Sequence, residues 1–171
     1  GLDFGIDMRC PIMSLPALLK TTLSTVPHPS PYIFADKDKV EWWARKLGKK
    51  VTPRIGIAWS GRATHNNDHN RTIPLKELKP LFDKDIEFHS LQIDYREHDE
   101  KQLSQVNNLF DHSEHLKDFG DTAGLINSLD LIIAVDTSVA HLAGAMGKPV
   151  WVLLPSWPDW RWMADRADSP W

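Results

Sequence analysis

Short apolar runs alternate with amphipathic segments from residue 53 onward. Runs at 55–59, 86–91, 131–135 and 150–154, with a weaker one at 116–119, predict strands. Helices are expected between them at 74–82, about 98–107, 121–129 and 138–146. This alternation is typical of a parallel α/β sheet. The almost purely apolar runs 131–135 and 150–154 suit central strands that are covered on both faces.

Right-handed crossovers restrict how these elements connect. The simplest arrangement is a Rossmann-like, doubly wound sheet of five parallel strands in the order 3-2-1-4-5. Its switch point lies between the first and fourth strands, and ligands bind there beyond the carboxyl ends of the strands. We therefore expect the loop after Trp59 and the turn after Val135 to line a binding site.

The first 50 residues have a different character. They are rich in proline, with a short helix possible at 14–25 and an amphipathic helix predicted at 36–47, ended by Gly48. We expect residues 1–50 to be a helical remnant or linker of a partner domain and residues 51–171 to be the Rossmann-like domain. Since the chain has no initiator Met and stops at Trp171 without a capping element, we interpret it as a fragment of a longer protein.

Composition narrows the class of protein. The 171 residues carry a net charge of −3 with scattered basic residues, which argues against a nucleic-acid partner. The single cysteine, Cys10, excludes an internal disulfide and suits a reducing compartment. No apolar run approaches the roughly 18–20 residues that span a bilayer, and no leader peptide is recognisable. The expected location is the cytoplasm.

The turn after the fourth strand carries the strongest chemical signal. Asp136 ends the strand and a helix follows at once, so free backbone N–H groups and the helix dipole favour an anion there. Thr137 and Ser138 add hydroxyl donors, and His141 lies one turn further on the same face. An alternative is that Asp136 or Thr137 is only an N-cap and His141 a surface residue. Placement at the switch point favours a binding role.

The loop that follows the first strand is long for a βα connection. It carries Arg62 and Arg71, and arginine can chelate a diphosphate in a fork. The alternative is a flexible, solvated loop, above all for residues 66–68. Although Gly56 and Gly61 imitate a P-loop spacing, Arg62 and Ala63 follow instead of Lys and Ser or Thr, so we reject that motif.

Two other classes of site fit poorly. His65 and His69 are four residues apart, and His112 and His115 three apart, but neither pair has the surrounding metal-site pattern, so no metal is expected. No G-x-S-x-G elbow supports a hydrolase. After the fifth strand, Asp159 and Trp160 belong to a tryptophan-rich stretch suited to stacking a base or sugar. The same tryptophans could instead pack against a partner.

The run from Val135 to Val150 resembles the D-T-x-x-x-H-L-A-x-A-x-G-x-P signature of glycosyltransferase family 9, the heptosyltransferase-like group. The chain as a whole resembles the C-terminal region of bacterial TPR-repeat proteins that carry such a domain. Pieces that match are 13–16, 56–61, 71–74, 90–92, 121–123 and 158–162. The segment 130–155 is the most specific.

This resemblance implies the C-terminal, donor-binding half of a GT-B glycosyltransferase that transfers a sugar to an unknown acceptor. It implies diphosphate contacts from Asp136, Thr137, Ser138, His141 and Arg71, and a base or ribose contact from Gln92. To these we add Arg62 as a diphosphate contact, and Ser60, Gly61, Asp159 and Trp160 as nucleotide or sugar contacts. Arg71 stands where the family has a lysine, and Ile73 replaces a tryptophan. No cofactor or metal is implied beyond the nucleotide-sugar substrate.

The catalytic base of this family belongs to the N-terminal domain, so the resemblance leaves catalysis by this chain alone in doubt. The expected partners are a nucleotide sugar and the missing N-terminal domain and TPR repeats of the parent protein. Two alternatives remain open. One is a non-catalytic nucleotide-binding module fused to TPR repeats. The other is a protein-interaction surface formed by Trp157, Trp160, Trp162 and Trp171.

Overall fold

The computed structural model describes residues 8–27, 30–82, 84–163 and 166–169. Its contacts divide the chain into two compact units. The larger unit covers residues 30–157 and contains the sheet. The smaller unit combines the described residues before 30 with those from 158 onward.

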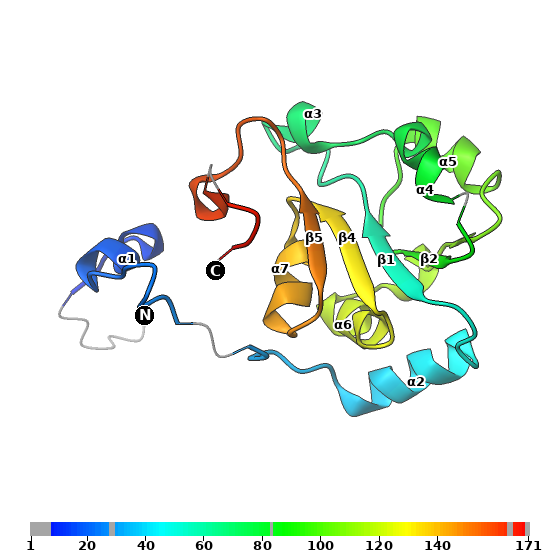
Figure 1. Cartoon of the computed structure of the whole chain (residues 1–171), viewed down its shortest axis with the longest axis horizontal. Helices are drawn as coiled ribbons and strands as arrows, with labels where there is room; N and C mark the ends of the chain where they lie inside the picture. The colour runs from blue at the N-terminus through cyan, green and yellow to red at the C-terminus, as the bar shows by residue number, and fades with distance from the viewer. Residues whose placement is uncertain (1–7, 28–29, 83, 164–165, 170–171) are drawn as a thin grey trace, which may run out of the picture. The chain divides into compact units, whose positions relative to one another are not determined.

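Five parallel strands form the sheet of the larger unit, in the order β3-β2-β1-β4-β5 (Figure 1). The strands are β1 (Arg54–Ala58), β2 (Glu87–Ser90), β3 (Leu109–Phe110), β4 (Leu131–Val135) and β5 (Val150–Leu153). Ile57 of β1 is opposite Ser90 of β2 on one side and Ile133 of β4 on the other. The strand order predicted from the sequence is confirmed, which places the switch point between β1 and β4.

Successive residues of β1 point to opposite faces of the sheet, and each face has its own core. Ala58 belongs to a cluster with residues of α2 (Lys37–Leu47), α6 (Phe119–Asn127) and α7 (Ser138–Ala145). Ile57 belongs to a second cluster that includes η2 (Leu75–Leu78) and the hydrophobic residues around α4 (Lys79–Phe82) and α5 (Glu97–Leu103). Helical segments on both faces make the sheet doubly wound.

Sequence signals account for the ends of the longest helix. Asp36 is the N-cap of α2, and its carboxylate accepts hydrogen bonds from the Asp38 and Lys39 amides. Gly48 ends the helix with φ of 66°, a backbone conformation that glycine adopts without steric cost. Trp43 lies in the middle of the helix and is buried against the sheet. The amphipathic helix predicted here is confirmed.

Several predicted elements differ in place or length. The third strand is Leu109–Phe110, not 116–119, and Leu116 instead follows the short helix η3 (Ser113–His115). The helix predicted at 121–129 begins earlier, because Asp118 is its N-cap and Asp121 closes a capping box with it. The segment 74–82 is divided between η2 and α4, and α5 ends at Leu103. Between β1 and η2, the polar loop contains a short helix, α3 (Asp68–Arg71).

Within its described residues, the smaller unit has three short elements: η1 (Ile12–Ser14), α1 (Leu15–Leu18) and η4 (Trp160–Trp162). The helix predicted at 14–25 is therefore a single turn, and Lys20 adopts a positive φ of 51° just beyond it. Asp159 is the N-cap of η4, and Trp160 is half-exposed. Both residues belong to this unit, whereas the other predicted site residues belong to the larger one.

Candidate functional site

Two connections meet at the carboxyl edge of the sheet, where β1 and β4 lie side by side. One is the loop from Ser60 to Thr72, and the other is the turn from Asp136 into α7. Arg71 joins them, because its Nη1 donates a hydrogen bond of 2.9 Å to the Asp136 carbonyl. The structure thus brings together the two segments that the sequence predicted to line one site.

Arg71 also packs against the start of its own loop. A Cβ atom added to Gly61 would lie only 2.6 Å from Arg71 Cζ, so a glycine here leaves space for the guanidinium. The Arg71 side chain is 14% exposed, and its Nε is buried without a hydrogen-bond partner among the described residues. This arginine therefore connects the two segments, and its guanidinium also lies 3.8 Å from the Asp68 carboxylate of its own loop.

The turn into α7 has the geometry of a capped helix start. Thr137 is the N-cap, and its hydroxyl accepts a hydrogen bond of 3.3 Å from the Val139 amide. The Ala140 amide bonds to the Thr137 carbonyl at 3.1 Å, and the Ser138 amide has no acceptor within the described part of the chain. The sequence alternative for Thr137, an N-cap, is thus observed, and Ser138 is left with an exposed side chain and an available donor.

His141 lies one turn into α7 on the side of Asp136. Its Nε2 is 3.7 Å from Asp136 Oδ1, and the imidazole is 49% exposed while the carboxylate is 20% exposed. Asp136 therefore contributes an acceptor beside the imidazole, and its carbonyl is already held by Arg71. His141 is the more accessible of the two side chains at this helix start.

Arg62 and Arg96 differ in how they are held. Arg62 is exposed and has no side-chain partner among the described residues. Arg96 donates to the Gly61 carbonyl at 3.1 Å and forms an ion pair with Asp68. Both arginines line a cavity of about 440 Å³ between the loop after β1 and the loop after β2, together with Thr64, Asp94 and Tyr95. Arg62 is free to meet a ligand there.

Ser60 and Gln92 bind each other at the ends of β1 and β2. Gln92 Oε1 accepts from the Ser60 amide at 3.1 Å, and Gln92 Nε2 donates to the Ser60 hydroxyl at 2.7 Å. The same Nε2 lies 3.2 Å from the Asp94 carbonyl. Both residues are buried, and their hydrogen bonds fix the loop after β1 relative to the loop after β2.

Asp68 and Arg96 were not singled out in the sequence, and residues 66–68 were considered a solvated stretch. Instead Asp68 begins α3, accepts from the Thr72 hydroxyl at 3.1 Å and pairs with Arg96 from the neighbouring loop. A loop of mixed polar residues has no periodicity that could reveal such a pairing. The only signal available was the position of Arg96 shortly after the second strand.

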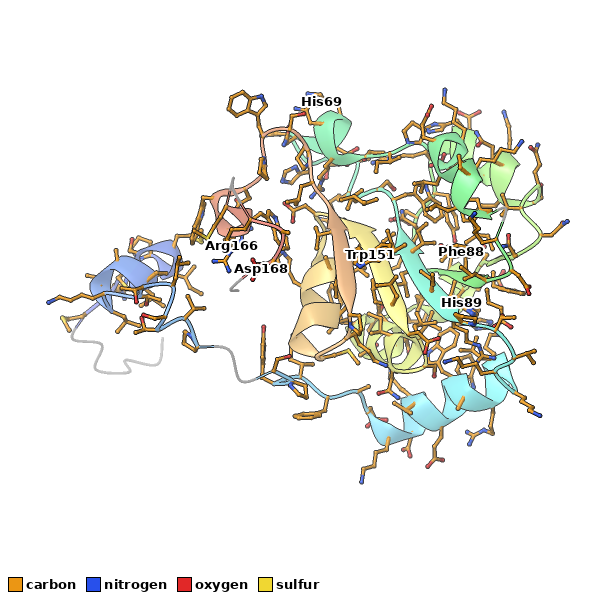
Figure 2. The ribbon with its side chains drawn as sticks, in the orientation of Figure 1. His69, Phe88, His89, Trp151, Arg166 and Asp168 are labelled. Atoms are coloured by element: carbon orange, nitrogen blue, oxygen red, sulfur yellow. The ribbon has the colours of Figure 1, made fainter. Side chains whose placement is uncertain are left out.

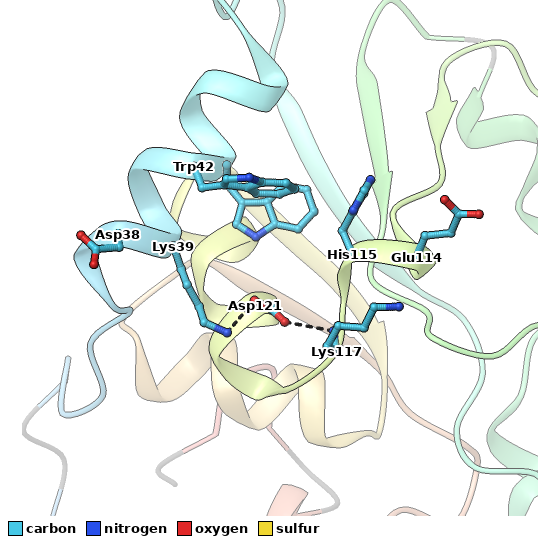
Figure 3. A pocket seen from close by; sticks show the side chains of 8 residues that line it. Asp38, Lys39, Trp42, Glu114, His115, Lys117 and Asp121 are labelled. Carbon is cyan, nitrogen blue, oxygen red and sulfur yellow. Dashed lines mark hydrogen bonds and ion pairs between the residues drawn. The ribbon is translucent and has the colours of Figure 1, made fainter.

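A second cavity, of about 400 Å³, lies on the α2 side of the larger unit (Figure 3). Trp42 of α2 and His115 of η3 line it, with ring centroids 5.4 Å apart. Lys39 and Asp121 form an ion pair at its base, and Lys39 also pairs with Asp118. These partners raise the pKa of Lys39 and, through Lys39, lower that of Asp118.

Histidines do not assemble a metal site within the described residues, where no group of three or more His, Cys, Asp or Glu side chains converges. His65 Nδ1 accepts a hydrogen bond of 3.1 Å from the Asn67 amide. Among those same residues, no helix combines the length and apolar character needed to cross a bilayer.

Comparison with known proteins adds no assignment. The chain matches no protein-family model, no curated protein and no solved structure. What is established is a Rossmann-like α/β fold with two connections braced together at its switch point.

Proposed function

We propose that the carboxyl edge of this sheet binds the diphosphate of a nucleotide sugar, as the donor-binding domain of a GT-B glycosyltransferase that transfers the sugar to an unknown acceptor. One observation carries the proposal: Arg71 joins the loop after β1 to the start of α7 at the switch point. Doubly wound sheets bind ligands at this place.

Electrostatics support an anionic ligand. The start of α7 has a partial positive charge of about half an elementary charge, and the Ser138 amide is available to donate. Arg71 adds a guanidinium that contacts the turn, with Asp68 Oδ1 3.8 Å from its Nε, and Arg62 adds an exposed guanidinium on the loop after β1. We assign direct contacts with the diphosphate to Ser138, His141 and Arg62, and a bracing role to Arg71.

Sugar transfer needs stabilisation of the departing diphosphate and a base near the acceptor hydroxyl. The residues above would supply the first, because fixed donors and positive charges oppose the negative charge that develops on the leaving group. We assign no base to this chain. In line with the resemblance to glycosyltransferase family 9, we infer that this base belongs to a separate N-terminal domain.

Calorimetric titration with UDP, ADP and GDP tests the proposal. At least one should bind, and Arg62→Ala or His141→Ala should weaken binding by tenfold or more, which corresponds to about 1.4 kcal/mol. Arg45→Ala is the matched control, since Arg45 is an exposed arginine on α2 that pairs with Glu41 one turn away. A folded wild-type protein that binds none of the three nucleotides would refute the proposal.

Exposed tryptophans favour a second candidate, a protein-interaction module. Trp157 is 90% exposed. Trp151 of β5, labelled in Figure 2, is 63% exposed. Large exposed aromatic side chains are common at interfaces. Sedimentation measurements on wild type and on a Trp151→Ser, Trp157→Ser variant test this candidate. A wild-type chain that stays monomeric at high concentration would argue against self-association through these residues.

A further inference from the structure

A buried pair of histidines connects β2 to the residues that follow β3, at one edge of the sheet. His89 is in β2 (Figure 2) and His112 lies two residues after β3, and they are 2% and 6% exposed. His89 Nδ1 and His112 Nε2 are 2.9 Å apart, and the angle between the planes of the two rings is 10°. Their centroids are 5.2 Å apart, much farther than the nitrogens, so the rings meet edge to edge in one hydrogen bond.

The hydrogen bond fixes the proton count of the pair. A neutral imidazole has one N–H, so only one of the two facing nitrogens carries a proton. His89 Nε2 is buried without a hydrogen bond among the described residues, but Glu87 Oε2 lies 3.5 Å from it, and this carboxylate favours a proton on that nitrogen. His112 Nε2–H then donates to His89 Nδ1, and His112 Nδ1 has no hydrogen-bond partner among the described residues.

Protonation acts on this bond in two steps. A first proton goes to His112 Nδ1 and leaves the bond in place. A second would put N–H groups on both facing nitrogens, and two donors 2.9 Å apart repel each other. The hydrogen bond can therefore form between two neutral imidazoles, but not between two imidazolium ions.

The surroundings oppose that charge. Burial is the main cause that lowers the pKa of each imidazole to about 4. Around His89, Arg54 opposes protonation and Glu87 favours it. Around His112, Lys46 of α2 and His115 of η3 oppose protonation, and the adjacent Asp111 favours it.

Other contacts share in holding the connection that His112 begins: the Tyr95 hydroxyl donates to Asp111 at 2.6 Å, and Leu109 and Leu116 are buried in the cores of the two sheet faces. Strand β3 has two residues, which pair with β2 as Phe88↔Leu109 and His89↔Phe110. Next comes η3, whose His115 lines the cavity opposite Trp42 (Figure 3). Trp43 contacts both His112 and His115 edge to face. The histidine bond thus ties the wall of this cavity to the sheet.

We propose that His89 and His112 form an acid-sensitive latch. While the pair is neutral it holds the segment 109–116 on the sheet. When both imidazoles are protonated, the segment detaches and the cavity between α2 and η3 opens. This device is independent of nucleotide binding and goes beyond it.

Hydrogen exchange followed by mass spectrometry from pH 7.5 to 4.5, corrected for intrinsic exchange rates, tests the latch. When segment 109–116 opens, the pKa of an exposed imidazole rises from about 4 to the ordinary value for histidine. At pH 5, each such imidazole multiplies the equilibrium constant for opening by roughly 30. We expect the amides of residues 109–116 to lose at least tenfold protection by pH 5, while those of α7 keep theirs. Equal protection at both ends of the range would overturn the proposal, as would a parallel loss in α7.

A non-titrating pair separates the latch from other acid effects. In His89→Asn, His112→Gln the Gln amide donates to the Asn carbonyl oxygen, and protection of 109–116 should become independent of pH. His115→Gln, which removes an imidazole from the same cavity, should leave the pH dependence in place. If the double variant does not fold, NMR titration of the imidazoles in the wild-type protein tests the latch instead. His89 and His112 should titrate over the same pH range in which residues 109–116 lose protection. Titration in a different pH range would refute the latch.

Discussion

Replacing Gly61 with alanine tests how the loop after β1 is held at the site. The added methyl would lie 2.6 Å from Arg71 Cζ and 2.9 Å from Nε, so the guanidinium must move. It would then give up its hydrogen bond to the Asp136 carbonyl. Such a charge-assisted bond contributes roughly 1.5–3 kcal/mol. The reduced freedom of the unfolded chain returns about 0.4–1 kcal/mol, because the glycine has no left-handed φ that alanine would resist.

The expected net loss is about 1–2 kcal/mol in the free energy of unfolding, measured by urea denaturation. Gly144→Ala is the matched control. Nothing lies within 4 Å of an added Cβ there, and the residue is inside α7, so we expect a gain of about 0.5–1 kcal/mol. Nucleotide affinity should fall in Gly61→Ala and stay unchanged in Gly144→Ala.

A double-mutant cycle isolates the contact. In an Arg71→Ala background the guanidinium is gone, so Gly61→Ala should cost nothing or stabilise slightly. The gain from the unfolded chain is the same in both backgrounds, so the coupling free energy between the two positions should be about 1.5–3 kcal/mol, the contribution of the lost bond. Equal stability of Gly61→Ala and Gly144→Ala, or a coupling near zero, would refute the bracing role of Arg71.

Two further changes test the core around the site. Asp99→Ala should lower the free energy of unfolding, measured by urea denaturation, by about 3 kcal/mol or more. The reason is that the buried carboxylate accepts hydrogen bonds from Trp59 Nε1 at 2.9 Å and from the Leu75 amide at 3.0 Å. The control Glu100→Ala, at an exposed residue, should change stability little. Gly56→Ala should cost about 1–3 kcal/mol by the same measurement, since its Cβ would lie within 2.8 Å of methyl groups from three core side chains. A cost below 0.5 kcal/mol for either core variant would contradict the packing described above.

The sheet was largely predictable because its strands leave an apolar pattern. Runs at 55–59 and 131–135 contain β1 and β4 almost residue for residue, and right-handed connection then fixes their order. Strand β3 was missed because two residues, Leu109 and Phe110, are too few to form a pattern. Leu116 contributed to the wrong prediction because it is buried in the core, although it follows a short helix.

The location of the candidate site could be predicted from the sequence, but most of its side-chain contacts could not. Topology alone puts the turn at Asp136 beside the loop that contains Arg71. Which atoms meet depends on side chains that reach across from other loops, as Arg96 reaches Asp68 and Gln92 reaches Ser60. The latch is a similar case, because His89 and His112 become neighbours only when β2 and β3 pair.

These internal contacts decide which predicted residues a ligand can contact without breaking a bond that positions the loops. The Gln92 amide is bonded to Ser60 and Asp94, and Arg71 Nη1 is bonded to Asp136, so a ligand that took either group would break a contact that positions the loops. The Arg62 guanidinium and the Ser138 amide carry no such cost, and the half-exposed His141 lies 3.7 Å from the Asp136 carboxylate at the same helix start. If the carboxyl edge binds a diphosphate, affinity should therefore depend first on Arg62, Ser138 and His141. Changes at Gln92 and Arg71 should lower stability and affinity together, because these residues preorganise the site.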